Sequence, residues 1–92
     1  MNPRDADTAE RIAACAAQLE RRCREAGSWI SGDGRIGEDV AAALLGISPA
    51  TLANRRFEGS APPHYRLGGG GHRITYSLAD LAVWVVGHRV ES

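Results

Sequence analysis

The sequence predicts one small, mainly α-helical domain that carries a β-hairpin, and three patterns indicate this fold class. Apolar residues recur at helical spacing through residues 8–26, two shorter helical segments meet at a Gly-Ile-Ser-Pro break, and four consecutive glycines separate two short alternating segments. A chain of 92 residues forms a single domain with a thin core. A large enzyme cleft framed by two domains is therefore not expected.

The first predicted helix begins at Asp7 or Thr8, either of which would cap its free amide groups, and continues to Ala26. Gly27 then suits a left-handed C-terminal cap. Apolar residues at spacings of four and three place one stripe along this helix, made of Ile12, Ala16, Leu19, Cys23 and Ala26. We expect the stripe to pack on its own domain. The alternative is a coiled coil with a second copy, which Ala and Cys in the seam would weaken.

The next segment holds an apolar stretch, a turn and a short strand. Trp29 is expected to cover the thin core, and a strand is expected at Arg35 and Ile36. A second helix is predicted over residues 38–45, with Val40, Ala41, Leu44 and Leu45 on its buried side.

The third helix starts after a break at Gly46 and Ile47. Ser48 is expected to cap it, and Pro49 suits its first position because proline has no N–H to leave unbonded. The helix is predicted to end at Gly59.

The prolines of residues 61–63 force an extended segment that leads into the predicted β-hairpin. Its strands are expected within residues 64–67 and 72–76, around the glycines of residues 68–71. Ser77 is predicted to cap a fourth helix over residues 78–88. The side chains expected on its buried side are Leu78, Leu81, Val85 and His88, with Trp84 adding a large buried surface.

Charge is balanced over the whole chain but unevenly distributed. Eleven arginines, with no lysine, are balanced by 11 acidic residues, which argues against a histone-like protein that coats DNA by bulk charge alone. Residues 46–76, by contrast, carry four arginines against Glu58 alone. This pattern predicts weak non-specific affinity for nucleic acid and reliance on a few placed arginine contacts.

The composition also indicates a compartment and argues against several kinds of site. No apolar run approaches the ~20 residues that span a bilayer, and no signal-peptide pattern is present, so we expect a cytoplasmic protein without a membrane partner. Cys15 and Cys23 would lie about 12 Å apart on one helix, too far for a disulfide. The cysteines and histidines lack zinc-ligand spacing, and no pattern supports a nucleotide site or catalysis. We expect no cofactor, no metal and no enzymatic activity.

Residues 40–56 follow a helix-turn-helix pattern. Ala42 is small where the helices would cross, Gly46 allows a tight turn, and Ile47 and Leu52 would fill the gap. Such a pair places its second helix in the DNA major groove, where asparagine pairs with adenine and arginine with guanine. The residues expected to face outward are Ser48, Pro49, Ala50, Ala53, Asn54 and Phe57.

From residue 36 to residue 90 the sequence resembles the small MerR-like winged helix-turn-helix domains of excisionases from phages and mobile elements. The resemblance follows residues 45–54 and Arg56, then Gly59, the Pro-Pro pair, residues 65–68, residues 76–81 and Trp84. It implies a recognition helix of about residues 49–57 in the major groove, and a wing of about residues 65–76 on the minor groove or backbone. Arg55 departs from the pattern, which has an apolar residue facing the core at this position; either Arg55 extends to solvent or phosphate, or the helix packs differently.

These observations divide the chain into an N-terminal helix with its linker, residues 1–34, and a winged helix-turn-helix DNA-binding domain, residues 35–92. The expected function is sequence-specific binding of double-stranded DNA in DNA recombination, as an excisionase that partners a site-specific recombinase. A transcriptional regulator on the same fold is one alternative, and a module that docks a recombinase or packaging partner is another. A second copy would join through the first helix or on DNA. The candidate DNA-binding residues are Ser48, Ala50, Thr51, Asn54, Arg55, Arg56, Arg66, His72 and Arg73.

Overall fold

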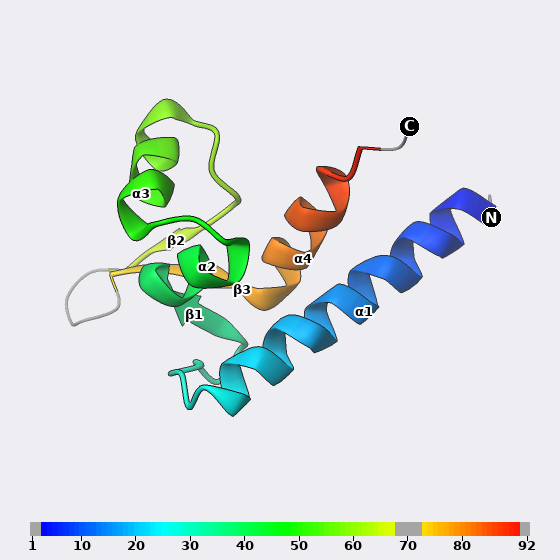
Figure 1. Ribbon diagram of the computed structural model, residues 1–92, viewed down its shortest axis with the longest axis horizontal. Helices are drawn as coiled ribbons and strands as arrows, with labels where there is room; N and C mark the ends of the chain where they lie inside the picture. The colour runs from blue at the N-terminus through cyan, green and yellow to red at the C-terminus, as the bar shows by residue number, and fades with distance from the viewer. Residues whose placement is uncertain (1–2, 68–72, 91–92) are drawn as a thin grey trace.

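The computed structural model describes residues 3–67 and 73–90, which form four helices and a three-stranded antiparallel sheet (Figure 1). The mainly helical class with a small sheet is confirmed. Strand β3 lies between β1 and β2. The elements are α1 (Pro3–Glu25), β1 (Arg35–Gly37), α2 (Glu38–Leu45), α3 (Pro49–Glu58), β2 (Tyr65–Arg66), β3 (Ile74–Ser77) and α4 (Leu78–Gly87).

Helix α1 begins at Pro3, so the prediction that Asp7 or Thr8 caps it is wrong. The Asp7 carboxylate instead pairs with Arg11 one turn further along, at 3.1 Å. The apolar stripe packs on its own domain as expected, because α1 lies against α4 and Cys23 is buried (Figure 1). Ala26 lies beyond the helix end and is exposed, which corrects its place in the stripe.

Helices α2 and α3 have the boundaries that the sequence predicts. Gly46 ends α2 with a φ of 77°, a conformation that glycine adopts without the steric cost of a Cβ, and Ile47 N–H bonds back to the Ala42 carbonyl at 3.0 Å. The Ser48 hydroxyl accepts from Thr51 N–H at 3.1 Å and so caps α3. Ala42 and Leu52 are fully buried between the two helices.

Strand β3 connects the sheet to α4. Ile36 lies opposite Tyr76 across β1 and β3, and Arg66 lies opposite Ile74 across β2 and β3. Ser77 caps α4 as predicted, since its hydroxyl accepts from Asp80 N–H at 2.9 Å.

The buried side of α4 differs from the prediction in its second half. Leu78, Leu81 and Ala82 are buried, but Val85 and His88 are exposed, and the Trp84 ring is only half-buried beside His88. The physical reason can be seen in Figure 1: the last turns of α4 extend away from the sheet.

The prediction that Trp29 covers the core is also wrong, because this side chain is 42% exposed in the loop after α1. Tyr76 on the central strand is instead the largest fully buried side chain. The rest of the core comes from every helix and from β1: Cys23, Ile36, Ala41, Ala42, Leu52, Leu78 and Leu81. Within the described residues, no helix has both the length and the apolar character that a membrane crossing requires.

Candidate nucleic-acid interface

The outer face of α3 presents a short row of exposed side chains. Ala50, Thr51, Asn54 and Phe57 follow helical spacing and are all exposed. Leu52 points the other way into the core, and Ala53 is half-buried, so Ala53 does not face outward as expected. The face thus combines one amide with small and aromatic groups, and the exposed carboxylate of Glu58 follows at the last position of the helix.

The hydroxyls at the start of α3 are occupied with each other. Ser48 Oγ and Thr51 Oγ1 lie 2.9 Å apart and share a hydrogen bond, in addition to the backbone cap. This hydrogen bond fixes the orientation of the Thr51 side chain in the first turn of α3.

Arg56 faces the interior of the molecule. Its Nε donates to Oε2 of Glu38 and its Nη2 donates to Oε1 of Glu38 at 2.9 Å, while the Tyr76 hydroxyl donates to the same Oε2 at 2.8 Å. The side chains of Arg56 and Glu38 are only 11% and 19% exposed. This network joins α3, α2 and β3, so the charge of Arg56 is already balanced inside the fold.

The pKa values of the three groups reflect this network. Burial alone raises the pKa of Glu38, but hydrogen bonds from Arg56 and Tyr76 outweigh it and leave the pKa below its ordinary value. The hydrogen bond to Glu38 raises the pKa of Arg56. Burial, reinforced by the hydrogen bond to Glu38, raises the pKa of Tyr76. All three groups therefore keep their usual charge at neutral pH.

Arg55 lies half-buried on the flank of α3. Its backbone carbonyl accepts from Ser60 N–H at 2.8 Å and so helps to end the helix. Among residues 3–67 and 73–90, its guanidinium has no ion pair within the chain. The side chain thus occupies the position expected to be apolar, and no acidic group of the described part of the chain pairs with it.

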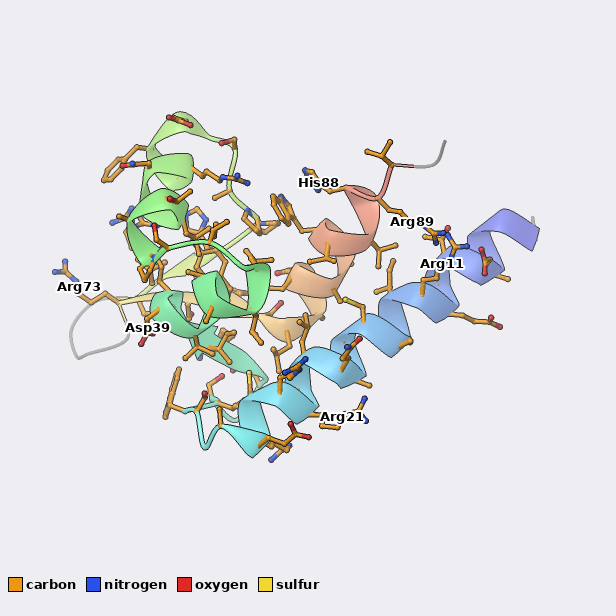
Figure 2. All side chains as sticks on the ribbon, in the orientation of Figure 1. Arg11, Arg21, Asp39, Arg73, His88 and Arg89 are labelled. Carbon is orange, nitrogen blue, oxygen red and sulfur yellow. The ribbon has the colours of Figure 1, made fainter. Side chains whose placement is uncertain are left out.

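The hairpin of β2 and β3 supplies two exposed arginines. Arg66 lies on β2, and Arg73 precedes β3, where its carbonyl accepts from Leu67 N–H at 2.8 Å. Figure 2 shows the Arg73 side chain directed away from the body of the molecule. His72 and the glycines of residues 68–71 lie outside the described residues. Figure 1 places α3 and the hairpin at one end of the molecule, remote from the N-terminus of α1.

A second network of charged side chains, centred on Arg35, connects the loop after α1 to the β2–β3 hairpin. Sequence patterns did not predict it. Arg35 pairs with Asp33 at 2.9 Å, donates from Nη1 to Thr75 Oγ1 at 3.0 Å, and lies over the Tyr65 ring at 5.6 Å from its centroid. Hydrogen bonds from Ser31 and then Arg35 lower the pKa of Asp33. Arg35 thus ties the loop after α1 to β3 and β2, and leaves Arg66 and Arg73 as the exposed cations of the hairpin. No local pattern marks this role, because its partners come from three separate segments.

Cys15 and Cys23 are free thiols, as their predicted separation requires. Within the described residues, no group of three or more His, Cys, Asp or Glu side chains gathers closely enough to hold a metal ion. Comparison of the chain with protein-family models, with curated proteins and with solved structures gives no match in any of the three. Support for a function therefore comes from the residues of this chain.

Proposed function

We propose that this chain binds double-stranded DNA in a sequence-specific manner through a winged helix-turn-helix. In this proposal α3 enters the major groove, and the β2–β3 hairpin acts as a wing on the minor groove or backbone. The supporting observation is that the exposed face of α3 and the exposed Arg66 and Arg73 lie at one end of the molecule (Figures 1 and 2).

The internal ion pair of Arg56 and Glu38 fixes the position of α3 in this arrangement. Base reading needs a helix whose position is fixed, and Arg56 anchors α3 to Glu38, which also accepts a hydrogen bond from Tyr76. Arg56 was a candidate DNA contact, but in the proposal it acts as a positioning residue. The phosphate contacts then come from Arg55, Arg66 and Arg73, with His72 a further candidate.

Three phosphate contacts predict a modest dependence on salt. Each contact contributes about −0.9 to the slope of log K against log salt concentration, so three give a slope of about −3. Such an interface steers binding without the strong non-specific attraction of a highly basic protein, in agreement with the zero net charge.

The test is a gel-shift survey of DNA fragments from the region that flanks the gene for this chain. We expect a specific complex whose affinity falls with salt, and Arg73→Ala should lower the salt slope by about one. Arg21 on α1 is exposed and labelled in Figure 2 far from Arg73, so Arg21→Ala is the matched control and should leave the slope unchanged. Absence of a specific complex on every fragment would overturn DNA binding and would favour the protein-docking module instead.

We further propose that the bound DNA is a recombination site, at which the chain acts as an excisionase beside a site-specific recombinase. The same binding chemistry suits a transcriptional regulator. An excision assay with a site-specific recombinase and a substrate that carries the bound site distinguishes the two, because only an excisionase should raise the yield of excised product. A reporter that responds to the chain while excision does not would assign it to transcription control.

A further inference from the structure

Phe57 is a large apolar side chain that α3 holds in solvent. It is 82% exposed, whereas Leu52, one and a half turns earlier, is completely buried. The Arg56 guanidinium lies 5.5 Å from the centroid of the Phe57 ring, and Glu38 holds that guanidinium in place. The ring is therefore exposed to solvent next to a guanidinium whose position is fixed.

The side chains that precede Phe57 on the outer face of α3 have a restricted chemistry. Ala50 offers a methyl group, and Thr51 offers a methyl group because its hydroxyl is bonded to Ser48. Asn54 supplies the amide of this face. Arg56 is turned inward to Glu38, so it does not extend a guanidinium across the outer surface of α3.

Each base pair displays a different pattern in the major groove. Thymine presents a C5 methyl group that favours apolar contacts, adenine presents the donor and acceptor that match an asparagine amide, and guanine is read best by arginine. The outer face of α3 from Ala50 to Phe57 matches the first two patterns, and the exposed carboxylate of Glu58, which would suit cytosine, stands at the last position of the helix. Of the two arginines of α3 that could suit guanine, Arg56 is committed to Glu38, and Arg55 lies half-buried on the flank, where the proposal assigns it to phosphate.

We infer that α3 recognises A·T base pairs, with Asn54 reading adenine and Phe57, assisted by Ala50 and Thr51, packing against thymine methyl groups. This inference rests on the proposed DNA binding and adds the class of base pair that the helix selects. Phe57 is the specificity-determining residue, because it contributes the largest apolar surface on the face.

The experiment begins with selection of bound sequences from double-stranded oligonucleotides with a random core of about 20 base pairs. We expect the selected core to contain A·T pairs at the positions that α3 protects. Each thymine of the best site is then replaced by deoxyuridine, which removes only the C5 methyl group. At one or two positions the affinity of the unmodified protein should fall about fourfold, the effect of exposing one buried methyl group.

The variant Phe57→Ala should bind more weakly and lose its sensitivity to deoxyuridine at those positions. Phe57 is 82% exposed, so its thermal unfolding midpoint should remain that of the unmodified protein. Val83→Ala on α4 is the matched control: Val83 is an exposed apolar residue, 52% accessible, outside the proposed interface, and the variant should keep both affinity and deoxyuridine sensitivity.

Two failures are distinguishable. If no sequence is selected, both the DNA-binding proposal and this inference are overturned. If a specific site is selected but its protected positions are G·C pairs, or if deoxyuridine has the same effect on the unmodified protein and on Phe57→Ala, sequence-specific binding stands and the inference about thymine is overturned.

Discussion

Removal of the Arg56 guanidinium tests whether the internal ion pair holds α3 in place. Arg56→Leu keeps an apolar stem but leaves the Glu38 carboxylate, 19% exposed, with the Tyr76 hydroxyl as its remaining hydrogen-bond donor from the network. An exposed ion pair contributes about 0–1 kcal/mol to the free energy of unfolding, and removal of one partner of a buried ion pair costs about 3–5 kcal/mol. Arg56 and Glu38 are largely buried and joined by two hydrogen bonds, so Arg56→Leu should lower the free energy of unfolding by about 2–3 kcal/mol. At about 4–8 °C per kcal/mol for a domain of this size, the unfolding midpoint should fall by roughly 10–20 °C.

The assay is thermal and urea unfolding, both followed by circular dichroism and arranged as a double-mutant cycle. Glu38→Leu combined with Arg56→Leu removes both charges and should recover much of the loss, because no unpaired carboxylate remains. The matched control is the surface pair of Arg24 and Glu20, whose side chains are 68% and 49% exposed at 3.1 Å. Arg24→Leu should change the free energy of unfolding by less than about 0.5 kcal/mol.

The same pair also predicts a dependence on pH. The Glu38 pKa lies below its ordinary value of 4.5, so the carboxylate stabilises the fold fully above that value. The contribution is lost as pH falls from about 4.5 through the lower pKa of the folded state. Between pH 6 and pH 3, Glu38→Gln should therefore lose less stability than the unmodified protein.

Two results would refute this reasoning about the ion pair. One is a cost for Arg56→Leu no larger than that for Arg24→Leu, which would make the pair an ordinary surface contact. The other is an equal loss of stability on acidification with and without the Glu38 carboxylate.

The remaining predictions concern the ends of α2 and α3 and the thiol of α1. Gly46→Ala should lower the free energy of unfolding by about 1–2 kcal/mol, because Gly46 has a φ of 77°. Gly87→Ala is the control and should not destabilise the fold, because Gly87 has no positive φ and has open space around it. Equal urea midpoints for the two variants would refute this prediction. Ser48→Ala should lower the free energy of unfolding by about 1 kcal/mol through loss of the cap, and an unchanged urea midpoint would argue against that cap. Glu58→Gln should strengthen DNA binding about twofold to threefold in a gel-shift titration, since it removes the acid of residues 46–76, and weaker binding would count against the proposed interface. Burial raises the pKa of the Cys15 thiol, so iodoacetamide should react with Cys15 more slowly in the native protein than in urea, as mass spectrometry of the labelled peptide would show; equal rates would contradict this.

Local chemistry accounts for the elements that the sequence predicted well. The boundaries of α2 and α3 depend on a glycine with positive φ, a serine cap and a proline at the first helical position, all of which act within a few residues. The turn from β3 into α4 has the same local origin in Ser77. Most of the exposed side chains on the candidate face of α3 could therefore be predicted from helical spacing alone.

Contacts between distant segments account for what the sequence did not predict. Arg56 resembled a surface cation in the sequence, yet it pairs with Glu38, 18 residues away, and the Tyr76 hydroxyl bonds to the same carboxylate. Trp29 resembled a core residue but lies in an exposed loop, while Tyr76 fills the centre.

The sequence by itself thus determined where α2 and α3 begin and end and most of the side chains that α3 presents at its surface, because caps and periodicity are local properties of the chain. Only the tertiary structure decided which arginines remain available to a ligand. A charged side chain goes inward when a carboxylate and a hydroxyl from other elements compensate the cost of its burial. For Arg56 those groups are Glu38 and Tyr76, while Arg66 and Arg73 stay exposed on the hairpin.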